Sequence, residues 1–225
     1  MYTVACVYRK KPGAPYSPIW VERLYKGVKR HATGDYEFVC LTDDMEVPHV
    51  EGIEYIPLQH PDWPGRGWWS KLEIFRPATF RKPLVYLDLD TLVVGDVSRL
   101  LSDGPFKAPR NYGGAANFCS TAFSVADPQE FTEFYQWFAM NSYNVVEAYD
   151  RFRDRSIGDQ AYMARMLTRM AKGWDYYSDY LVPSYKHHCR HGYPEKADAV
   201  AIAFHGRPKM NELNNWAGTY WQGLA

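Results

Sequence analysis

Residues 84–93 read Leu-Val-Tyr-Leu-Asp-Leu-Asp-Thr-Leu-Val, an apolar run interrupted by two carboxylates two positions apart. The run Leu84–Leu89 predicts a buried β-strand. Open α/β sheets bind ligands beyond the carboxyl ends of their strands, which is where Asp88 and Asp90 would lie. Carboxylate oxygens suit Mg²⁺ or Mn²⁺, which keep positions open for water and phosphate. The stretch therefore indicates either a divalent-metal site or a turn that the two aspartates cap.

Strands and helices alternate on the amino-terminal side of this stretch. Earlier strands are predicted at Tyr2–Tyr8, Tyr36–Leu41 and Ile53–Ile56. Helices are predicted from Ser17, whose neighbour Pro18 suits a first turn, and over Ser70–Arg76, which Pro77 should end. The alternation predicts an α/β fold with a mixed, mainly parallel sheet flanked by helices. The length of 225 residues fits one domain spanning 1–225.

The carboxy-terminal half is less regular. Strands are predicted at Ser120–Val125 and Val200–Phe204, and helices at Pro128–Phe138 and Gly158–Met170. The His-rich segment Tyr185–His191 has no matching metal ligands elsewhere in the sequence, so it is interpreted as a loop before the last strand.

Composition excludes several classes of protein. The 26 basic and 26 acidic residues balance, so a strongly basic nucleic-acid-binding protein is not indicated. Four cysteines lie far apart (Cys6, Cys40, Cys119, Cys189), which disfavours a zinc knuckle or a disulfide scaffold. Because the basic residues Arg9–Lys11 follow the first apolar run, and no membrane-spanning run is present, we expect a soluble, cytoplasmic protein without a transmembrane segment.

A phosphatase of the haloacid-dehalogenase type is an alternative use of an acidic strand end. Such enzymes carry Asp-x-Asp-x-Thr/Val close to their first strand. Here 87 residues precede Asp88, and Thr91 comes one position too early. That much chain suits a nucleotide-binding half ahead of a metal site, so the phosphatase becomes the minor alternative.

Residues 69–75 (WSKLEIF) and 85–93 (VYLDLDTLV) resemble glycosyltransferase family 8, the glycogenin and bacterial galactosyl/glucosyltransferase group, and its GT-A relatives. Three further segments follow in the family's order. Residues 117–125 resemble its Asn-Ser-Gly-Val strand region, residues 158–160 its Asp-Gln helix start, and residues 204–209 its His…Lys motif. The resemblance runs from the first strand to about Lys209. It implies a GT-A fold and a metal-dependent glycosyltransferase, with retention of anomeric configuration.

The resemblance also implies a ligand set. Asp88, Asp90 and His205 would coordinate one Mn²⁺ or Mg²⁺, and the imidazole favours Mn²⁺. Gly206 would let the backbone approach the donor, and Lys209 would neutralise diphosphate charge. The family motif usually has wider spacing and ends in Pro-Trp, whereas Met210 follows Lys209 here.

Catalytic roles are carried over in the same way. Lys71 would reach the donor phosphate or sugar; otherwise it is a solvated helix lysine. Asp159 and Gln160 would face the donor sugar near its reacting carbon; otherwise Asp159 stabilises the helix start.

The nucleotide would lie at the ends of the first two strands. The resemblance implies contacts with Val7, Tyr8 and Arg9 and with Leu89 between the two aspartates; Asp44 would accept a hydrogen bond from uracil or ribose, or lie in a solvated turn. The implied donor is a UDP-sugar. The acceptor stays open among a glycan, a lipid-linked glycan, a protein and a modified nucleic acid, and the oligomeric state is open too.

The loop before Lys71 contains three tryptophans, Trp63, Trp68 and Trp69. They would form a sugar platform or lid, or else fasten the loop to the core.

Two other classes of function remain. One is a phosphatase or nucleotidyltransferase that uses the acidic strand end. The other is a nucleotide-sugar-binding module without turnover.

Overall fold

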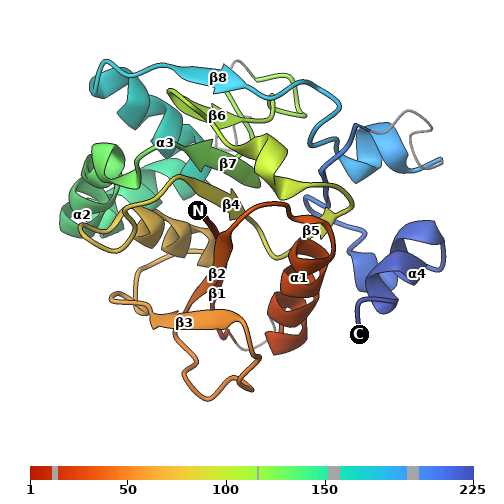
Figure 1. Ribbon diagram of the computed structural model, residues 1–225. Helices are drawn as coiled ribbons and strands as arrows, with labels where there is room; N and C mark the ends of the chain where they lie inside the picture. The colour runs from red at the N-terminus through yellow and green to blue at the C-terminus, as the bar shows by residue number, and fades with distance from the viewer. Residues whose placement is uncertain (12–14, 116, 152–157, 192–197) are drawn as a thin grey trace.

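The structure, a computed structural model, describes residues 1–11, 15–115, 117–151, 158–191 and 198–225. Its central sheet contains seven strands: β1 (Tyr2–Tyr8), β2 (Tyr36–Thr42), β3 (Ile53–Pro57), β4 (Leu84–Leu87), β6 (Phe106–Ala108), β7 (Ala122–Val125) and β8 (Trp174–Tyr176). Their order across the sheet is β3-β2-β1-β4-β7-β6-β8 (Figure 1). Strands β3, β2, β1 and β4 are parallel, and β7 runs antiparallel to both β4 and β6. The predicted mixed, mainly parallel sheet is confirmed.

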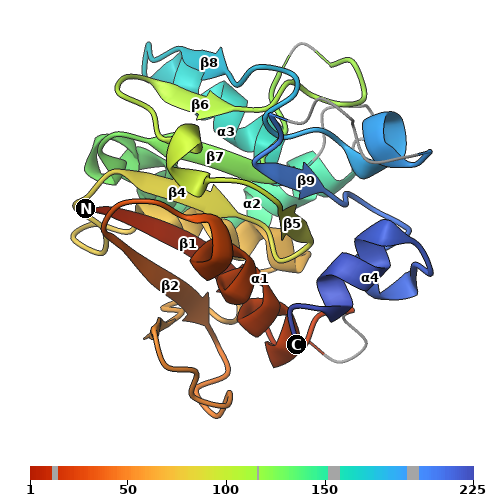
Figure 2. The ribbon, with the colours of Figure 1, turned by 45° about the vertical axis from the view of Figure 1, so that its right-hand side comes forward.

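Helices cover both faces of this sheet. On one face lie α1 (Pro18–His31) and α4 (Trp216–Gln222); on the other lie α2 (Thr132–Arg151), α3 (Gly158–Arg169) and the 3₁₀ helix η1 (Gly67–Phe75) (Figures 1 and 2). Side chains alternate along β1, so that Val4 and Cys6 join the core beneath α1 while Ala5 joins the core beneath η1 and α2. Every strand near the centre is therefore buried on both sides.

A second, two-stranded sheet brings the carboxy-terminal segment to the acidic stretch. Strand β5 (Thr91–Val93) pairs antiparallel with β9 (Ala201–Ala203). The backbone N–H of Phe204 also donates to the carbonyl of Asp90 over 3.0 Å. Residues 204–209 thus lie beside the two aspartates, although more than a hundred positions separate them in sequence.

Several boundaries differ from those predicted. Strand β4 ends at Leu87, because the chain turns over Asp88–Thr91, where the Thr91 N–H donates to the Asp88 carbonyl over 3.1 Å, to start β5. The helix predicted at Pro128–Phe138 is a 3₁₀ turn, η3 (Pro128–Phe131), followed by the much longer α2.

The remaining short elements are η2 (Val97–Leu100), η5 (Met210–Glu212) and η4 (Tyr185–Cys189), a π-helical turn where a loop was predicted. Strands β5, β6 and β8 and helix α4 were not predicted, since three to seven residues carry too little periodicity to be recognised. In the part of the chain that the structure describes, no helix is both long and apolar enough to cross a membrane.

Candidate active site

A cavity of about 530 Å³ opens at the carboxyl edge of the parallel strands, where the acidic stretch emerges. Its walls come from the ends of β1 and β4, from η1, from the start of α3 and from the segment after β9. Eleven of the residues predicted for the site line it: Val7, Arg9, Lys71, Asp88, Leu89, Asp90, Asp159, Gln160, His205, Gly206 and Lys209. Residues from both halves of the chain are therefore assembled in one place.

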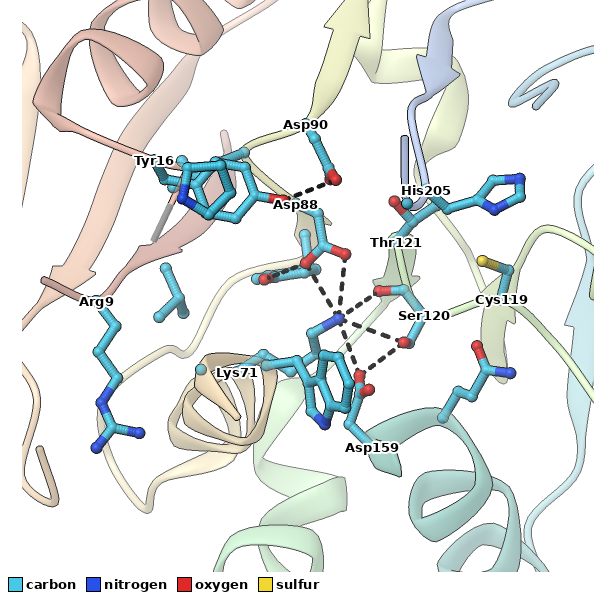
Figure 3. Close-up of a pocket in the computed structure, with 18 of the residues that line it drawn as sticks. Arg9, Tyr16, Lys71, Asp88, Asp90, Cys119, Ser120, Thr121, Asp159 and His205 are labelled. Atoms are coloured by element: carbon cyan, nitrogen blue, oxygen red, sulfur yellow. Dashed lines mark hydrogen bonds and ion pairs between the residues drawn. The ribbon is translucent and has the colours of Figure 1, made fainter. Parts of the chain in front are cut away.

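Lys71 lies at the floor of this cavity and is almost fully buried, with 2% of its side chain exposed. Its ammonium contacts Oδ1 of Asp88 at 3.0 Å, Oδ2 of Asp159 at 2.9 Å and the carbonyl of Ser120 at 3.0 Å (Figure 3). The second oxygen of Asp88 and the hydroxyl of Ser120 also lie 3.3 Å away. The three N–H donors of the ammonium are thus fully used by acceptors on these three residues. The solvated-lysine alternative is excluded, and Asp159 does more than stabilise a helix start, because it is one of the two counter-ions of Lys71.

Burial and charge compete at this cluster. Burial alone would lower the pKa of Lys71, but the carboxylates of Asp159 and Asp88 outweigh it and raise the pKa above its ordinary value. For Asp88, desolvation raises the pKa more than the positive charge of Lys71 lowers it. The negative charges of Asp90 and Asp159 raise it further, so that the pKa of Asp88 is about 6. Lys71 therefore stays charged at neutral pH, while the carboxyl of Asp88 loses its proton at about pH 6, only slightly below neutral.

Two residues of this cluster were missed from the sequence. The hydroxyl of Tyr86 donates to Oδ1 of Asp88 over 2.7 Å, and the hydroxyl of Ser120 donates to Oδ2 of Asp159 over 2.6 Å. A signal for Tyr86 existed, because residues two apart on a strand point the same way and Tyr86 precedes Asp88 by two. Ser120 carried no such signal, since it comes from a different strand end.

Asp90 is held by a second lysine and a second tyrosine. Its Oδ2 accepts a hydrogen bond from Tyr16 over 2.8 Å and forms an ion pair with Lys209, whose ammonium also donates to the carbonyl of Phe204 over 3.0 Å. Tyr16, in the loop before α1, was also missed. In this structure the ammonium of Lys209 pairs with Asp90, and its pairing with a diphosphate stays a prediction.

His205 lines the cavity, but its ring points away from the two carboxylates (Figure 3). The imidazole is stacked between Tyr112 and His187, with ring centroids 5.1 and 5.7 Å away, and its Nε2 lies 2.7 Å from Oγ of Ser184. Burial, followed by the positive charge of Lys186, lowers the pKa of His205 to about 4. The ring is therefore neutral at pH 7.

The predicted nucleotide end is assembled in part. Arg9 lines the cavity, donates to the carbonyl of Trp63 over 3.2 Å and lies 3.8 Å from Asp43. Tyr8 is buried in the core, and Asp44 pairs with Lys10 at 3.1 Å. Neither Tyr8 nor Asp44 lines the cavity, and their predicted contacts with the base or ribose stay predictions.

Comparison with known proteins gives a match in structure only. Neither a protein-family profile nor a curated protein sequence matches the chain. The glycosyltransferase GlyE from Streptococcus pneumoniae TIGR4 matches with a TM-score of 0.68 at 14% identity, over 100% of this chain and 61% of GlyE. An active-site mutant of LgtC matches with a TM-score of 0.66 at 12% identity, over 99% of this chain and 94% of LgtC. The galactosyltransferase LgtC in complex with donor and acceptor sugar analogues gives a TM-score of 0.64 at 11% identity, with the same coverage.

The fold is that of GT-A glycosyltransferases. The fold predicted from the resemblance is thus confirmed, while membership of family 8 stays a prediction, because identities this low carry the fold alone. This chain spans 61% of the length of GlyE, so the longer protein contains regions that have no counterpart here.

Within this GT-A fold, the residues that fit a hard divalent cation are Asp88 and Asp90. Both line the cavity, and their carboxylates are the ligand type that Mn²⁺ and Mg²⁺ prefer. Across the described residues, no three His, Cys, Asp or Glu side chains are grouped closely enough to hold a metal. His205 is neutral, which is the form that binds metals, but it would have to turn its ring to join the carboxylates.

Proposed function

We propose that this protein is a glycosyltransferase that moves a sugar from a UDP-sugar to an acceptor, with the help of Mn²⁺ or Mg²⁺. The observation that carries the proposal is the pair of lysine–aspartate clusters in one cavity, Lys71 with Asp88 and Lys209 with Asp90. They lie at the sheet edge where α/β proteins bind nucleotides, in a fold shared with solved glycosyltransferases.

The charges of the cavity suit a metal-bound diphosphate. Its lining holds four cationic side chains (Arg9, Lys11, Lys71, Lys209) and three carboxylates (Asp88, Asp90, Asp159). With His205 neutral, the lining carries one net positive charge. A nucleotide sugar is dianionic, so a divalent cation and a nucleotide sugar together leave that balance unchanged. Binding of the cation alone or of the nucleotide sugar alone would leave unpaired charge in a partly buried site, which carries a free-energy penalty.

Asp88 and Asp90 would hold the metal, with His205 as a third ligand if its ring turns. The metal would act as a Lewis acid on the diphosphate oxygens. Lys209, at the wall of the cavity, would leave Asp90 and donate to the departing diphosphate, because its ammonium can exchange one anion for another. Lys71 is saturated by acceptors on three residues, so its role is to hold Asp88 and Asp159 in place.

Asp159 and Gln160 would position the donor sugar. Both line the cavity at the start of α3, with Asp159 held by Lys71 and Ser120. A fixed carboxylate next to the reacting carbon stabilises the oxocarbenium-like charge of glycosyl transfer. Transfer with retention belongs to this proposal on the strength of the family resemblance.

The first experiment is donor hydrolysis by the purified full chain. A panel of UDP-, GDP-, ADP- and CMP-sugars is incubated with Mn²⁺ or with chelator, and the released nucleotide is measured. We expect Mn²⁺-dependent release of UDP from one UDP-sugar. Asp90→Asn should reduce it at least about 100-fold, because loss of a metal ligand removes the charge stabilisation of the leaving group.

His205→Ala separates two versions of the metal site. If the imidazole turns and binds the metal, the affinity for Mn²⁺ in the presence of UDP should fall about ten-fold. If it does not, the affinity will match the wild type.

Two outcomes of the donor panel would contradict the proposal. No nucleotide release from any donor, together with no Mn²⁺-dependent binding of UDP, would reject the glycosyltransferase and favour the phosphatase class. Binding of the donor without any release would identify a nucleotide-sugar-binding module.

A further inference from the structure

Three tryptophans lie just before Lys71 in the sequence (Trp63, Trp68, Trp69), and the structure places them in two environments. Trp63 and Trp69 are 5% and 0% exposed, and both pack on Phe138, with ring centroids 4.7 and 4.9 Å away. These two fasten the loop to the core. Trp68 is half-buried and is the one of the three that lines the cavity.

The geometry of η1 explains this division. A 3₁₀ helix has three residues per turn, so side chains three apart lie on the same side. Trp68 and Lys71 accordingly both reach the cavity, while Trp69 and Leu72, one position further along, are both buried in the core. The turn that places Lys71 against Asp159 thus also sets Trp68 in the cavity wall.

The orientation of the indole is fixed from two sides. Gly158, with φ +76°, lies so close that a Cβ there would be 3.2 Å from Nε1 of Trp68. The guanidinium of Arg66, which is not a lining residue, lies over the ring at 4.9 Å from the centroid. Nε1 is buried and has no hydrogen-bond partner among the residues that the structure describes. The N–H edge therefore faces the backbone at the start of α3, and the carbon surface of the ring is what a ligand can reach.

We propose that Trp68 binds the transferred sugar of the donor and helps to select it. The inference rests on the proposed function and extends it to a residue that acts by contact area rather than charge. The charged groups of the cavity suit the diphosphate. Trp68 gives an aromatic surface near Lys71 and Asp159, where the sugar attached to that diphosphate would lie. An aromatic ring packs well against the C–H face of a pyranose, and the locked orientation means little freedom is lost on binding.

The test separates affinity for the sugar from affinity for the nucleotide. Binding of UDP, UDP-glucose and UDP-galactose is measured by calorimetry with Mn²⁺ for the wild type, Trp68→Phe and Trp68→Leu. For the better-bound UDP-sugar we expect roughly a ten-fold higher Kd in Trp68→Leu, and a smaller increase in Trp68→Phe, which keeps a ring. The Kd of UDP should stay within about two-fold. Equal losses for UDP and UDP-sugar, or no loss, would overturn the inference.

Trp137→Phe is the matched control. Trp137 is also half-buried with a guanidinium over its ring, that of Arg169 at 5.5 Å, but it lies on α2 and outside the cavity lining. Trp137→Phe should leave the affinities for UDP, UDP-glucose and UDP-galactose unchanged. A loss in Trp137→Phe equal to that in Trp68→Phe would assign the effect to general loosening and reject the sugar contact.

A second measurement uses the wild-type sequence and does not depend on variant affinities. In the full chain labelled with 5-fluorotryptophan, the ¹⁹F resonance absent from the Trp68→Phe spectrum should shift with the UDP-sugar and stay in place with UDP. If the protein binds both ligands and this resonance does not distinguish them, the role of Trp68 is wrong while the proposed function stands. If the protein binds no nucleotide, the proposed function itself fails.

Discussion

Asp88 and Asp90 leave the same strand end, yet they are held by differently built parts of the molecule. Asp88 is held by Lys71 and Tyr86, which come from η1 and β4 within the core. Asp90 is held by Lys209 and Tyr16, which come from the segment after β9 and the loop before α1. Each aspartate therefore has one lysine and one tyrosine, but only the first set is fixed by regular elements.

The two lysines differ in their number of partners. The ammonium of Lys71 has acceptors on three residues, two of them carboxylates, whereas Lys209 has one carboxylate and one carbonyl. A saturated, buried cation cannot move to a ligand without leaving two carboxylates unpaired. The comparison indicates that the Lys71 cluster is a fixed framework and that the Lys209 cluster is the part able to exchange partners with a donor.

The largest expected effect concerns stability. Lys71→Met keeps the length of the side chain but leaves Asp88 and Asp159 without their shared cation, so we expect the free energy of unfolding to fall by about 3–5 kcal/mol. Lys209→Met leaves one carboxylate unpaired, and Tyr16 still donates to it, so we expect a fall of about 1–2 kcal/mol. Urea unfolding of both variants measures the difference. Equal losses would contradict the distinction between framework and exchangeable cluster.

The second prediction is a pH dependence that belongs to Asp88. Its raised pKa of about 6 means that the carboxyl gains a proton as the pH falls through 6, and a protonated carboxyl does not bind metal. Below pH 6, the affinity for Mn²⁺ should fall by about ten-fold per pH unit, and above pH 7 it should be constant. Electron paramagnetic resonance of free Mn²⁺ in the presence of UDP-glucose, whose diphosphate does not titrate in this range, gives the affinity. A constant affinity from pH 5 to 7 would contradict the assignment.

The same contrast explains how much could be read from the sequence. The Asp88 cluster was largely predictable, since Asp88, Lys71 and Asp159 each belong to a motif next to a clear strand or helix. In the Asp90 cluster, Asp90 and Lys209 were predicted as site residues, but their pairing was not. The second partner of Asp90 was missed because Tyr16 lies in a loop without periodicity. The contact of Tyr16 with Asp90, 74 positions away in sequence, arises only in the tertiary structure.

The position of His205 shows a related limit. The sequence placed residues 204–209 at the site, and three of them line the cavity. The pairing of β9 with β5 brings this segment there. The sequence could not give the direction of the imidazole, which is set by the stack between Tyr112 and His187 and by Ser184. Tyr112 and Ser184 come from segments with no motif of their own, and His187 comes from the His-rich segment, which was interpreted only as a loop. Their contacts with His205 arise in the tertiary structure.

The smallest expected effect compares the two tyrosines. The hydroxyl of Tyr86 donates to Asp88 and thereby lowers the pKa of that carboxyl, against the larger effect of burial. Tyr86→Phe removes this bond, so the acidic fall in Mn²⁺ affinity should move toward higher pH by roughly one pH unit. Tyr16→Phe acts on Asp90 instead, so the affinity should drop a few-fold at every pH while the midpoint of the fall stays near pH 6.

The same titration tests both variants, and the pair forms its own control, because each loses one hydroxyl next to one aspartate. A shift of the midpoint in Tyr86→Phe alone would tie the titrating group to Asp88 and separate the two clusters functionally. Equal shifts in both variants would mean that Asp88 and Asp90 titrate as one unit. Lys71 and Lys209 would then have to be regarded as parts of a single network, and the ability of Lys209 to exchange Asp90 for a diphosphate would lose its basis.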